Sequence, residues 1–418
     1  MYRKSILANG VRVITEAMPA VRSATIGIWA DIGSAAESAP QRGVSHLVEH
    51  MLFKGTQTRT AREIAEEMDG VGGNLNAFTD KETTCYYAKV IDHHVPLAID
   101  VLSDMFLHST FDPGELSKEQ KVVLEEIKMY DDSPDELIHD LFVQTMWNDS
   151  NLGAPTIGFS ETVSKLTRDD LREHMRLRYA PNSVVITAAG NIDHDKIVAQ
   201  FEERFAQFTG SCILPQPQVP ALTPSALFRY KESEQAYVVI GTRGLSVRDD
   251  RRYVLSVMDT ILGGGMSSRL FQEIREKRGL VYTVYSFQAA YRGAGLFAVY
   301  AGTSPQSVQE CVAVICDQFA ALRETPVTDA ELRLAKAHIK GSLLLALESS
   351  SSRMMRLGRS EFSLGRQLET EEIEQQIEEV TAEQIQGLAG ELLAEQNLGL
   401  CVLGPVEEDS IDWNRSAA

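Results

Sequence analysis

The pattern of hydrophobic and polar positions predicts strands and helices along the first half of the chain. Residues 23–33 alternate in the manner of a half-buried strand, and residues 43–53 place apolar side chains at helical spacing. Residues 60–68 predict a second helix, in which Thr60 is the N-cap and Glu63 completes a capping box. Further elements predicted up to residue 208 are strands at 74–78, 83–90 and 183–189, and helices at 94–108, 113–130, 135–147, 167–177 and 193–208.

The second half of the chain repeats the order of the first. It predicts strands at 236–241, 281–290 and 296–302, and helices at 251–262, 268–277, from Pro305 and from Asp329. Between the halves lie four prolines in a polar stretch that cannot continue regular structure. We therefore expect an internal duplication, with one domain at 1–208, a linker at 209–225 and a second, homologous domain at 226–418.

The connections between the predicted strands indicate the fold class. In each half, the strands are separated either by short turns or by pairs of helices. This order predicts two α+β domains, each with a mainly antiparallel sheet and helices packed on one face.

Composition and charge narrow the class of protein. The 418 residues are 44% hydrophobic and 24% charged, which is typical of a soluble globular protein with more than one domain. The formal net charge of −19 argues against a nucleic acid partner. The acidity would favour positively charged peptides if it lined a cavity, but it also fits simple solubility.

No segment of the sequence predicts a membrane anchor or a disulfide framework. Apolar runs such as 343–347 are far shorter than the roughly 20 residues that cross a bilayer, and the N-terminus lacks the apolar core of a signal peptide. The five cysteines are scattered without a C-x-x-C pair, which excludes a thiolate zinc site of that type. We expect a cytoplasmic protein.

Residues 43–56, GVSHLVEHMLFKGT, carry a candidate catalytic motif. His46 and His50 stand four residues apart on the predicted helix, so both imidazoles project from one face and can bind one metal ion. Glu49 lies beside them, within reach of a metal-bound water, where a general base is needed. H-x-x-E-H is the signature of the inverted zincins. The alternative is a buried amphipathic helix whose histidines form local hydrogen bonds.

A catalytic zinc needs a third protein ligand, and residues 116–130 offer candidates on a predicted helix. Glu119 and Glu126 are seven residues apart and share one face, two turns from each other. Glu125 points about 100° away from Glu126 around the helix, so we prefer Glu126 to it. The alternative is a solvated acidic face.

Together, these residues resemble the family of pitrilysin, insulin-degrading enzyme and the mitochondrial processing peptidases, in a short bacterial-type form with two domains. In that family, the third ligand is the second acid of an E-x6-E helix about 76 residues after the second histidine, which here is Glu126. The resemblance assigns Glu119 the role of a nearby acid that orients a ligand. It implies one Zn²⁺ per chain, because the second half has no H-x-x-E-H motif.

Residues 72–79, GGNLNAFT, resemble the edge strand that accepts substrate in this family through backbone hydrogen bonds. The substrate-binding residues that the resemblance implies are Asn74, Asn76, Ala77 and Phe78. The alternative is an ordinary hairpin that follows a glycine turn.

Residues 275–282, REKRGLVY, resemble the R-x6-Y element of the family. The resemblance implies that Arg275 and Tyr282 contact the substrate and its transition state. The alternative is a basic helix end capped by Gly279, with Tyr282 at the start of a strand.

The resemblance implies a zinc metalloendopeptidase that hydrolyses peptides or unfolded segments inside a closed chamber. A chain of this length resembles half of a clamshell, so we expect a homodimer in which Arg275 and Tyr282 complete the zinc site of the other subunit. Heterodimerisation with a similar chain is the main variant. Two other functions stay open: a maturation peptidase for a targeting presequence or a cofactor-precursor peptide, and a non-catalytic assembly subunit of the same fold.

Overall fold

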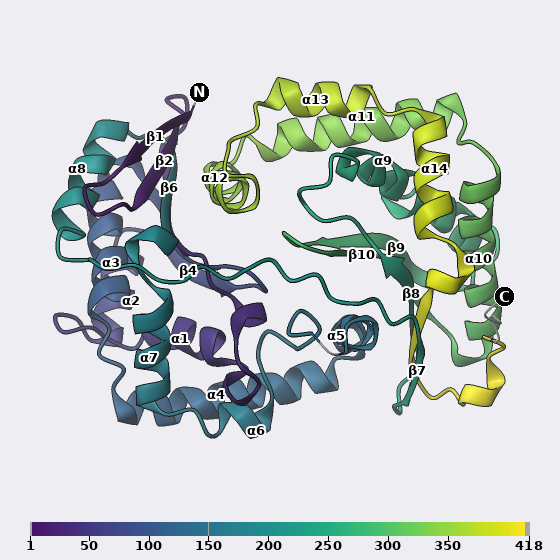
Figure 1. Cartoon of the computed structure of the whole chain (residues 1–418), viewed down its shortest axis with the longest axis horizontal. Coiled ribbons are helices and arrows are strands. Elements are labelled where there is room, and N and C mark those ends of the chain that lie inside the picture. The colour runs from purple at the N-terminus through teal and green to yellow at the C-terminus, as the bar shows by residue number, and fades with distance from the viewer. Residues whose placement is uncertain (1, 149, 414–418) are drawn as a thin grey trace. The chain divides into compact units, whose positions relative to one another are not determined.

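The computed structural model describes residues 2–148 and 150–413, which form two compact units (Figure 1). The first unit comprises Met1–Lys128, Ala154–Gln216 and Leu344–Gln367, and the second comprises Met129–Gly153, Pro217–Leu343 and Leu368–Ala418. The segment expected to be a linker, 209–225, contains one of the passages from the first unit to the second. The division differs from a contiguous one because 129–153 packs with the second unit and 344–367 with the first.

The first unit contains a six-stranded sheet in the order β1-β2-β6-β3-β5-β4, in which β2 and β6 are parallel and the other neighbours antiparallel. Its strands are β1 (Tyr2–Ile6), β2 (Arg12–Ala17), β3 (Ser23–Ala30), β4 (Asn74–Thr79), β5 (Thr84–Ile91) and β6 (Val184–Gly190). Side chains alternate between the two faces of a strand. In β3, Ile26 and Ile28 therefore join one core, whereas Trp29 joins another on the opposite face.

Most helices of the first unit enclose the core that contains Ile26 and Ile28. They are α1 (Val44–Leu52), α2 (Ala61–Asp69), α3 (Val95–His108), α6 (Ser160–Val163), α7 (Arg168–Arg178), α8 (His194–Arg204) and α4 (Pro113–Asp132), whose last turn belongs to the second unit. The first turns of α2 and α4 carry acidic residues, as the helix dipole favours. The capping box of Thr60 and Glu63 is confirmed at the start of α2.

A single helix from late in the sequence, α12 (Ser350–Leu364), lies on the other face of this sheet. Its Gly358 passes so close to Trp29 that an added Cβ would lie 2.3 Å from the indole Cε2. Its Glu361 is buried and pairs with Lys4 at 2.7 Å and with Arg12 at 2.9 Å. The helix therefore closes the second face with both apolar packing and charge pairing.

The second unit repeats this plan with a five-stranded sheet in the order β7-β11-β8-β10-β9. Its strands are β7 (Ala226–Tyr230), β8 (Ala236–Arg243), β9 (Val281–Ala290), β10 (Gly295–Thr303) and β11 (Gly399–Gly404), and only β7 and β11 pair in parallel. One face is covered by α9 (Arg252–Gly263), α10 (Val308–Glu324), α13 (Thr370–Glu378) and α14 (Ala382–Leu392), with α11 (Asp329–Ala346) beside them. On the other face, α5 (Pro134–Met146) places His139 against Tyr285, with Nε2 3.1 Å from the hydroxyl.

The predicted α+β class with mainly antiparallel sheets is confirmed, and each sheet carries one further helix on its second face. The helix expected at 268–277 is present over 269–276, and its residues Phe271–Glu276 form a π-helix. The helix expected at 193–208 ends at Arg204, because Phe205 and Phe208 leave the helical path to pack around Phe106. In the part of the chain that is described, no helix is long and apolar enough to cross a bilayer.

Candidate metal centre

Helix α1, which carries the H-x-x-E-H motif, is fixed at its start by a glycine and a buried carboxylate. Gly43 precedes the helix with φ +95°, a backbone conformation that glycine adopts without steric cost. The buried Glu37 carboxylate accepts hydrogen bonds from the backbone N–H groups of Gly43 at 2.7 Å and Ser45 at 2.8 Å. These N–H groups have no partner within the helix, so Glu37 serves as a cap from a distant position.

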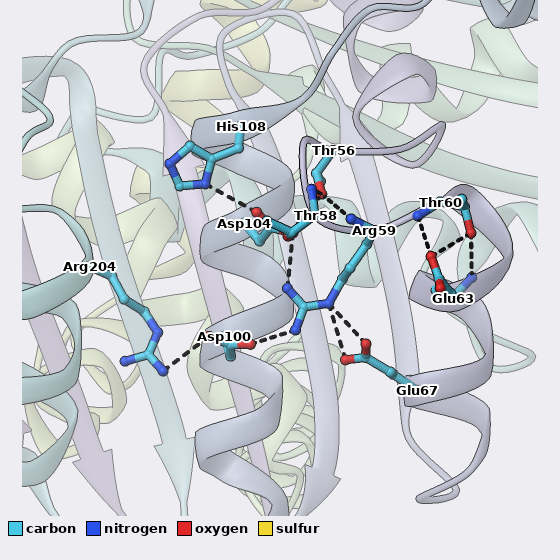
Figure 2. Close-up of polar contacts among 10 residues, drawn as sticks. All are labelled: Thr56, Thr58, Arg59, Thr60, Glu63, Glu67, Asp100, Asp104, His108 and Arg204. Atoms are coloured by element: carbon cyan, nitrogen blue, oxygen red, sulfur yellow. Dashed lines mark hydrogen bonds and ion pairs between the residues drawn. The ribbon is translucent and has the colours of Figure 1, made fainter.

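The segment after α1 is held by a network of charged side chains around Arg59 (Figure 2). Arg59 donates to Glu67 of α2 at 3.0 Å and to Asp104 of α3 at 2.9 Å, and it also pairs with Asp100. Thr56 donates to the same Asp104 carboxylate at 2.7 Å. The path from α1 to α2 is thereby tied to α3, and both ends of the motif helix are anchored.

The structure brings His46, His50 and Glu126 together, as the sequence predicts. One ligand atom of each lies within 4.8 Å of those of the other two, and Nε2 of His50 is 3.7 Å from Oε2 of Glu126. Among the described residues, this is the one group of three or more His, Cys, Asp or Glu residues close enough to hold a metal ion. A tetrahedral zinc with bonds of about 2.1 Å separates its ligands by about 3.4 Å, so the three donors fit zinc with small side-chain movements.

The protonation states also suit a metal. Burial and, to a smaller extent, the neighbouring His50 lower the pKa of His46 to about 3. His46 is therefore neutral at physiological pH and has a lone pair to offer a metal ion. Its Nδ1 atom is buried and makes no hydrogen bond with the described residues.

Glu119 contacts His50, which is the geometry that the role implied by the resemblance requires. Nδ1 of His50 lies 3.1 Å from Oε2 of Glu119, and Nζ of Lys54 lies 2.8 Å from Oε1 of the same carboxylate. Glu119 is buried, so both contacts form in a low dielectric. With Nδ1 donating to Glu119, Nε2 of His50 is the nitrogen left to face Glu126.

Glu49 lies half-buried beside the histidines, in an environment that suits a proton acceptor. Burial raises the pKa of Glu49, a hydrogen bond from Thr79 opposes this, and the charge of Glu126 raises it further. The Thr79 hydroxyl donates to Oε2 of Glu49 at 2.6 Å. A carboxylate with a raised pKa is a stronger base and transfers protons more readily near neutral pH.

The strand expected to receive substrate is an edge strand. β4 pairs only with β5 in the described sheet, so its other side has no strand partner, and there the Asn76 side chain accepts a hydrogen bond from the Ala77 N–H at 2.8 Å. Asn74 and Asn76 are exposed, and Phe78 on the same face packs edge-on against Trp29 at 5.5 Å. Thr79, at the end of the strand, was not among the residues predicted from the sequence. Only its position after Phe78 could have drawn attention to it.

Arg275 and Tyr282 lie together in the second unit. The Arg275 guanidinium carbon is 5.0 Å from the centre of the Tyr282 ring, and the Tyr282 side chain is 75% exposed. Gly279 has φ +65° and Tyr282 lies in β9, so the features of the simpler interpretation are also present. The catalytic role of the pair stays a prediction.

Comparison with known proteins gives two matches to family models. A model described as "Insulinase (Peptidase family M16)" matches residues 12–159, and one described as "Peptidase M16 inactive domain" matches residues 165–339. An uncharacterized zinc protease of Bacillus subtilis, YmxG, is 44% identical over 97% of this chain and 98% of its own length.

Solved structures share the fold at low sequence identity. A peptidase M16 inactive domain from Pseudomonas fluorescens has a TM-score of 0.90 at 21% identity, over 97% of this chain and 98% of its own. A chain of complex III2 from Candida albicans has a TM-score of 0.86 at 19% identity, over 99% and 98%.

Proposed function

This chain belongs to peptidase family M16 and is a zinc-dependent metalloprotease, and from this premise we propose that it is an endopeptidase for peptides and unfolded segments. The observation that carries the proposal is the convergence of His46 and His50 from α1 with Glu126 from α4. Beside this group lie the carboxylate of Glu49 and the open edge of β4. Metal ligands, a base and a backbone template are the three parts that peptide hydrolysis at a zinc site requires.

In the proposed mechanism, His46, His50 and Glu126 hold one Zn²⁺ per chain. When bound, zinc supplies Lewis-acid chemistry, because it acidifies water and polarises the carbonyl oxygen of a peptide bond. Glu49 accepts a proton from the attacking water and later delivers it to the nitrogen of the leaving amine. Glu119 keeps the His50 ring in the orientation and tautomer that binding requires.

The substrate is proposed to bind as an added strand along β4. Backbone hydrogen bonds from Asn74, Asn76, Ala77 and Phe78 would read the extended shape of a peptide more than its sequence. A folded protein has no free extended segment to offer, which favours peptides and unfolded chains.

The proposed assembly is a homodimer that encloses the substrate in a chamber. In it, Arg275 and Tyr282 of one subunit complete the zinc centre of the other, where a guanidinium and a phenol stabilise the developing oxyanion. Their packing against each other supports a joint role, because the Arg275 guanidinium carbon lies 5.0 Å from the Tyr282 ring centre.

Two other functions have less support. A maturation peptidase would use the same centre on a narrow set of peptides. A non-catalytic assembly subunit fits the structural likeness to a chain of complex III2, which is a likeness of fold alone. The presence and clustering of all three metal ligands favour catalysis over that role.

Metal analysis of the purified chain, combined with hydrolysis of a mixed peptide library before and after chelation, tests the proposal. We expect one zinc per chain, hydrolysis that chelation abolishes and zinc restores, and a dimer by light scattering. Glu49→Gln should retain zinc and lose hydrolysis, whereas His50→Ala should lose both. A chain that binds no zinc, or a Glu49→Gln variant with unchanged turnover, would refute the mechanism, and an active monomer would refute completion by a second subunit.

A further inference from the structure

The carboxylate of Glu49 has a single hydrogen-bond partner among the described residues, and that partner is Thr79. The Thr79 hydroxyl donates to Oε2 of Glu49 at 2.6 Å. A short hydrogen bond from a neutral hydroxyl to a carboxylate is stronger than one between neutral groups, and it fixes the direction in which the carboxylate faces. The base proposed for hydrolysis is therefore oriented by one side chain.

Thr79 owes its position to the alternation of β4. Leu75 and Ala77 pack toward the core that contains α1, whereas Asn74, Asn76 and Phe78 project from the other face. Thr79 continues the first set and so points its hydroxyl at α1. Its backbone pairs with Thr84 of β5, and this pair ends the ladder between the two strands.

The same strand is the open edge of the sheet. β4 has β5 on one side and no described strand on the other, so one row of its backbone groups is held less firmly than in a central strand. A peptide that adds to this edge supplies the missing hydrogen bonds and fixes the strand along its whole length. Thr79 is the last residue of the strand, so a peptide that makes the strand more rigid also fixes the Thr79 hydroxyl and, through its hydrogen bond, the carboxylate of Glu49.

We propose that Thr79 is a positioning residue that links occupancy of the β4 edge to the orientation of Glu49. The inference rests on the proposed function, in which Glu49 is the base and β4 receives the substrate. Binding energy from parts of a peptide remote from the scissile bond then appears in kcat, because it is used to hold the base in its reactive geometry. A peptide long enough to cover β4 should have a higher kcat than a short peptide with the same cleavage site.

Three variants separate this role from a general effect on the fold. Thr79→Val removes the hydroxyl and keeps the branched shape that a strand favours. Thr79→Ser restores the hydroxyl on a smaller side chain. Thr25→Val is the matched control, because Thr25 is a buried threonine of the same sheet whose hydroxyl contacts Ser350 of α12 at 3.0 Å, on the face opposite to α1.

The measurements are kcat and KM on a short and a long peptide that share one cleavage site, together with zinc content and far-UV circular dichroism. We expect Thr79→Val to lower kcat on the long peptide by about 10- to 100-fold with KM and zinc content unchanged. It should also abolish the kcat advantage of the long peptide. Thr79→Ser should recover most of both effects, and Thr25→Val should behave as the parent chain. If Thr79→Val fails to fold, Thr79→Ala carries the same expectation.

Three results would overturn the inference while leaving the proposed function intact. These are a Thr79→Val kcat within twofold of the parent value, a loss of zinc in proportion to the loss of activity, and a Thr79→Ser variant as slow as Thr79→Val. A parent chain without zinc-dependent hydrolysis would overturn the proposed function itself, and this inference with it.

Discussion

Removing the charge of Glu119 should weaken zinc binding without removing a ligand. Glu119→Gln replaces a charge-assisted contact of 3.1 Å to Nδ1 of His50 by a neutral one and also breaks the 2.8 Å pair with Lys54. Loss of such a partner behind a metal-bound histidine typically costs 10- to 100-fold in metal affinity. This range corresponds to about 1.4 to 2.8 kcal/mol of binding free energy. We expect the upper half of the range, because Glu119 is buried and water cannot replace its charge.

The assay is a zinc titration of the metal-free protein in competition with a chelator of known affinity. The matched control is Glu125→Gln, a change of the same kind on the same helix. The Glu125 side chain is 68% exposed and, among the residues that the structure describes, pairs with Lys128 alone. That exposed pair contributes little, so the control should bind zinc as the parent chain does. A Glu119→Gln affinity within twofold of the control would refute the view that Glu119 prepares His50 for the metal.

Three further predictions concern the scaffold. Burial raises the pKa of Glu37 from 4.5 to about 7, so the unfolded chain releases this proton at lower pH than the folded chain does. The contribution of Glu37 to the free energy of unfolding should therefore fall as the pH rises from about 4.5 to about 7. Urea denaturation of the metal-free protein measures this fall, and Glu37→Gln should make it smaller. Gly358→Ala forces a Cβ against Trp29 and should destabilise the chain by about 1 to 3 kcal/mol, whereas Gly387→Ala in α14, which meets open space, should stabilise it slightly. Arg59→Met removes the cation that Glu67, Asp100 and Asp104 share, although Asp100 still pairs with Arg204 and Asp104 still accepts a hydrogen bond from Thr56. It should lower the free energy of unfolding by about 1.5 to 3 kcal/mol, and high salt should reduce this loss. An unchanged free energy of unfolding would show that the network in Figure 2 contributes nothing.

The metal ligands could be predicted from the sequence because local periodicity and a family spacing determine them. His46 and His50 lie one helical turn apart wherever the helix lies, and the spacing of Glu126 from them matches the family pattern. The partner of Glu49 could not be predicted in this way. Thr79 and Glu49 are 30 residues apart in the sequence and meet only because strand β4 lies against helix α1. A threonine at the end of a strand has no distinctive sequence pattern of its own.

The capping of α1 by Glu37 escaped prediction for a similar reason. A local N-cap that accepts a hydrogen bond is a serine, threonine, aspartate or asparagine directly before the helix, whereas the residue there is Gly43, which has no side-chain acceptor. Glu37 caps the helix instead, although it lies six residues before Gly43. It follows a short 3₁₀ turn that the hydrophobic pattern does not predict. The hydrophobic periodicity also could not predict that α5 packs in the second unit and α12 in the first. The apolar faces of these helices indicate that they pack on a sheet, but not on which one.

This exchange makes the first unit dependent on residues far downstream, and a truncation tests the dependence. A chain that ends at Gln216 retains the metal ligands but lacks α12, so it exposes the sheet face that contains Ile14, Trp29 and Val185. Exposing each such side chain to water costs about 1.5 to 3 kcal/mol of stability, and the sum approaches the whole free energy of unfolding of a typical domain, which is about 5 to 15 kcal/mol.

We expect the truncated chain to lack the near-ultraviolet signal of an ordered Trp29 and to bind a dye specific for exposed apolar surface, with no cooperative urea transition. Supplying residues 217–418 as a second chain should restore the tryptophan signal and the cooperative transition and should abolish dye binding, because that piece contains α12 and also the sheet on which α5 packs. A cooperative transition and an ordered tryptophan in the truncated chain alone would mean that α12 covers a face that is already stable. The first unit would then fold from its own contiguous sequence, and the late helix would serve some purpose other than stability.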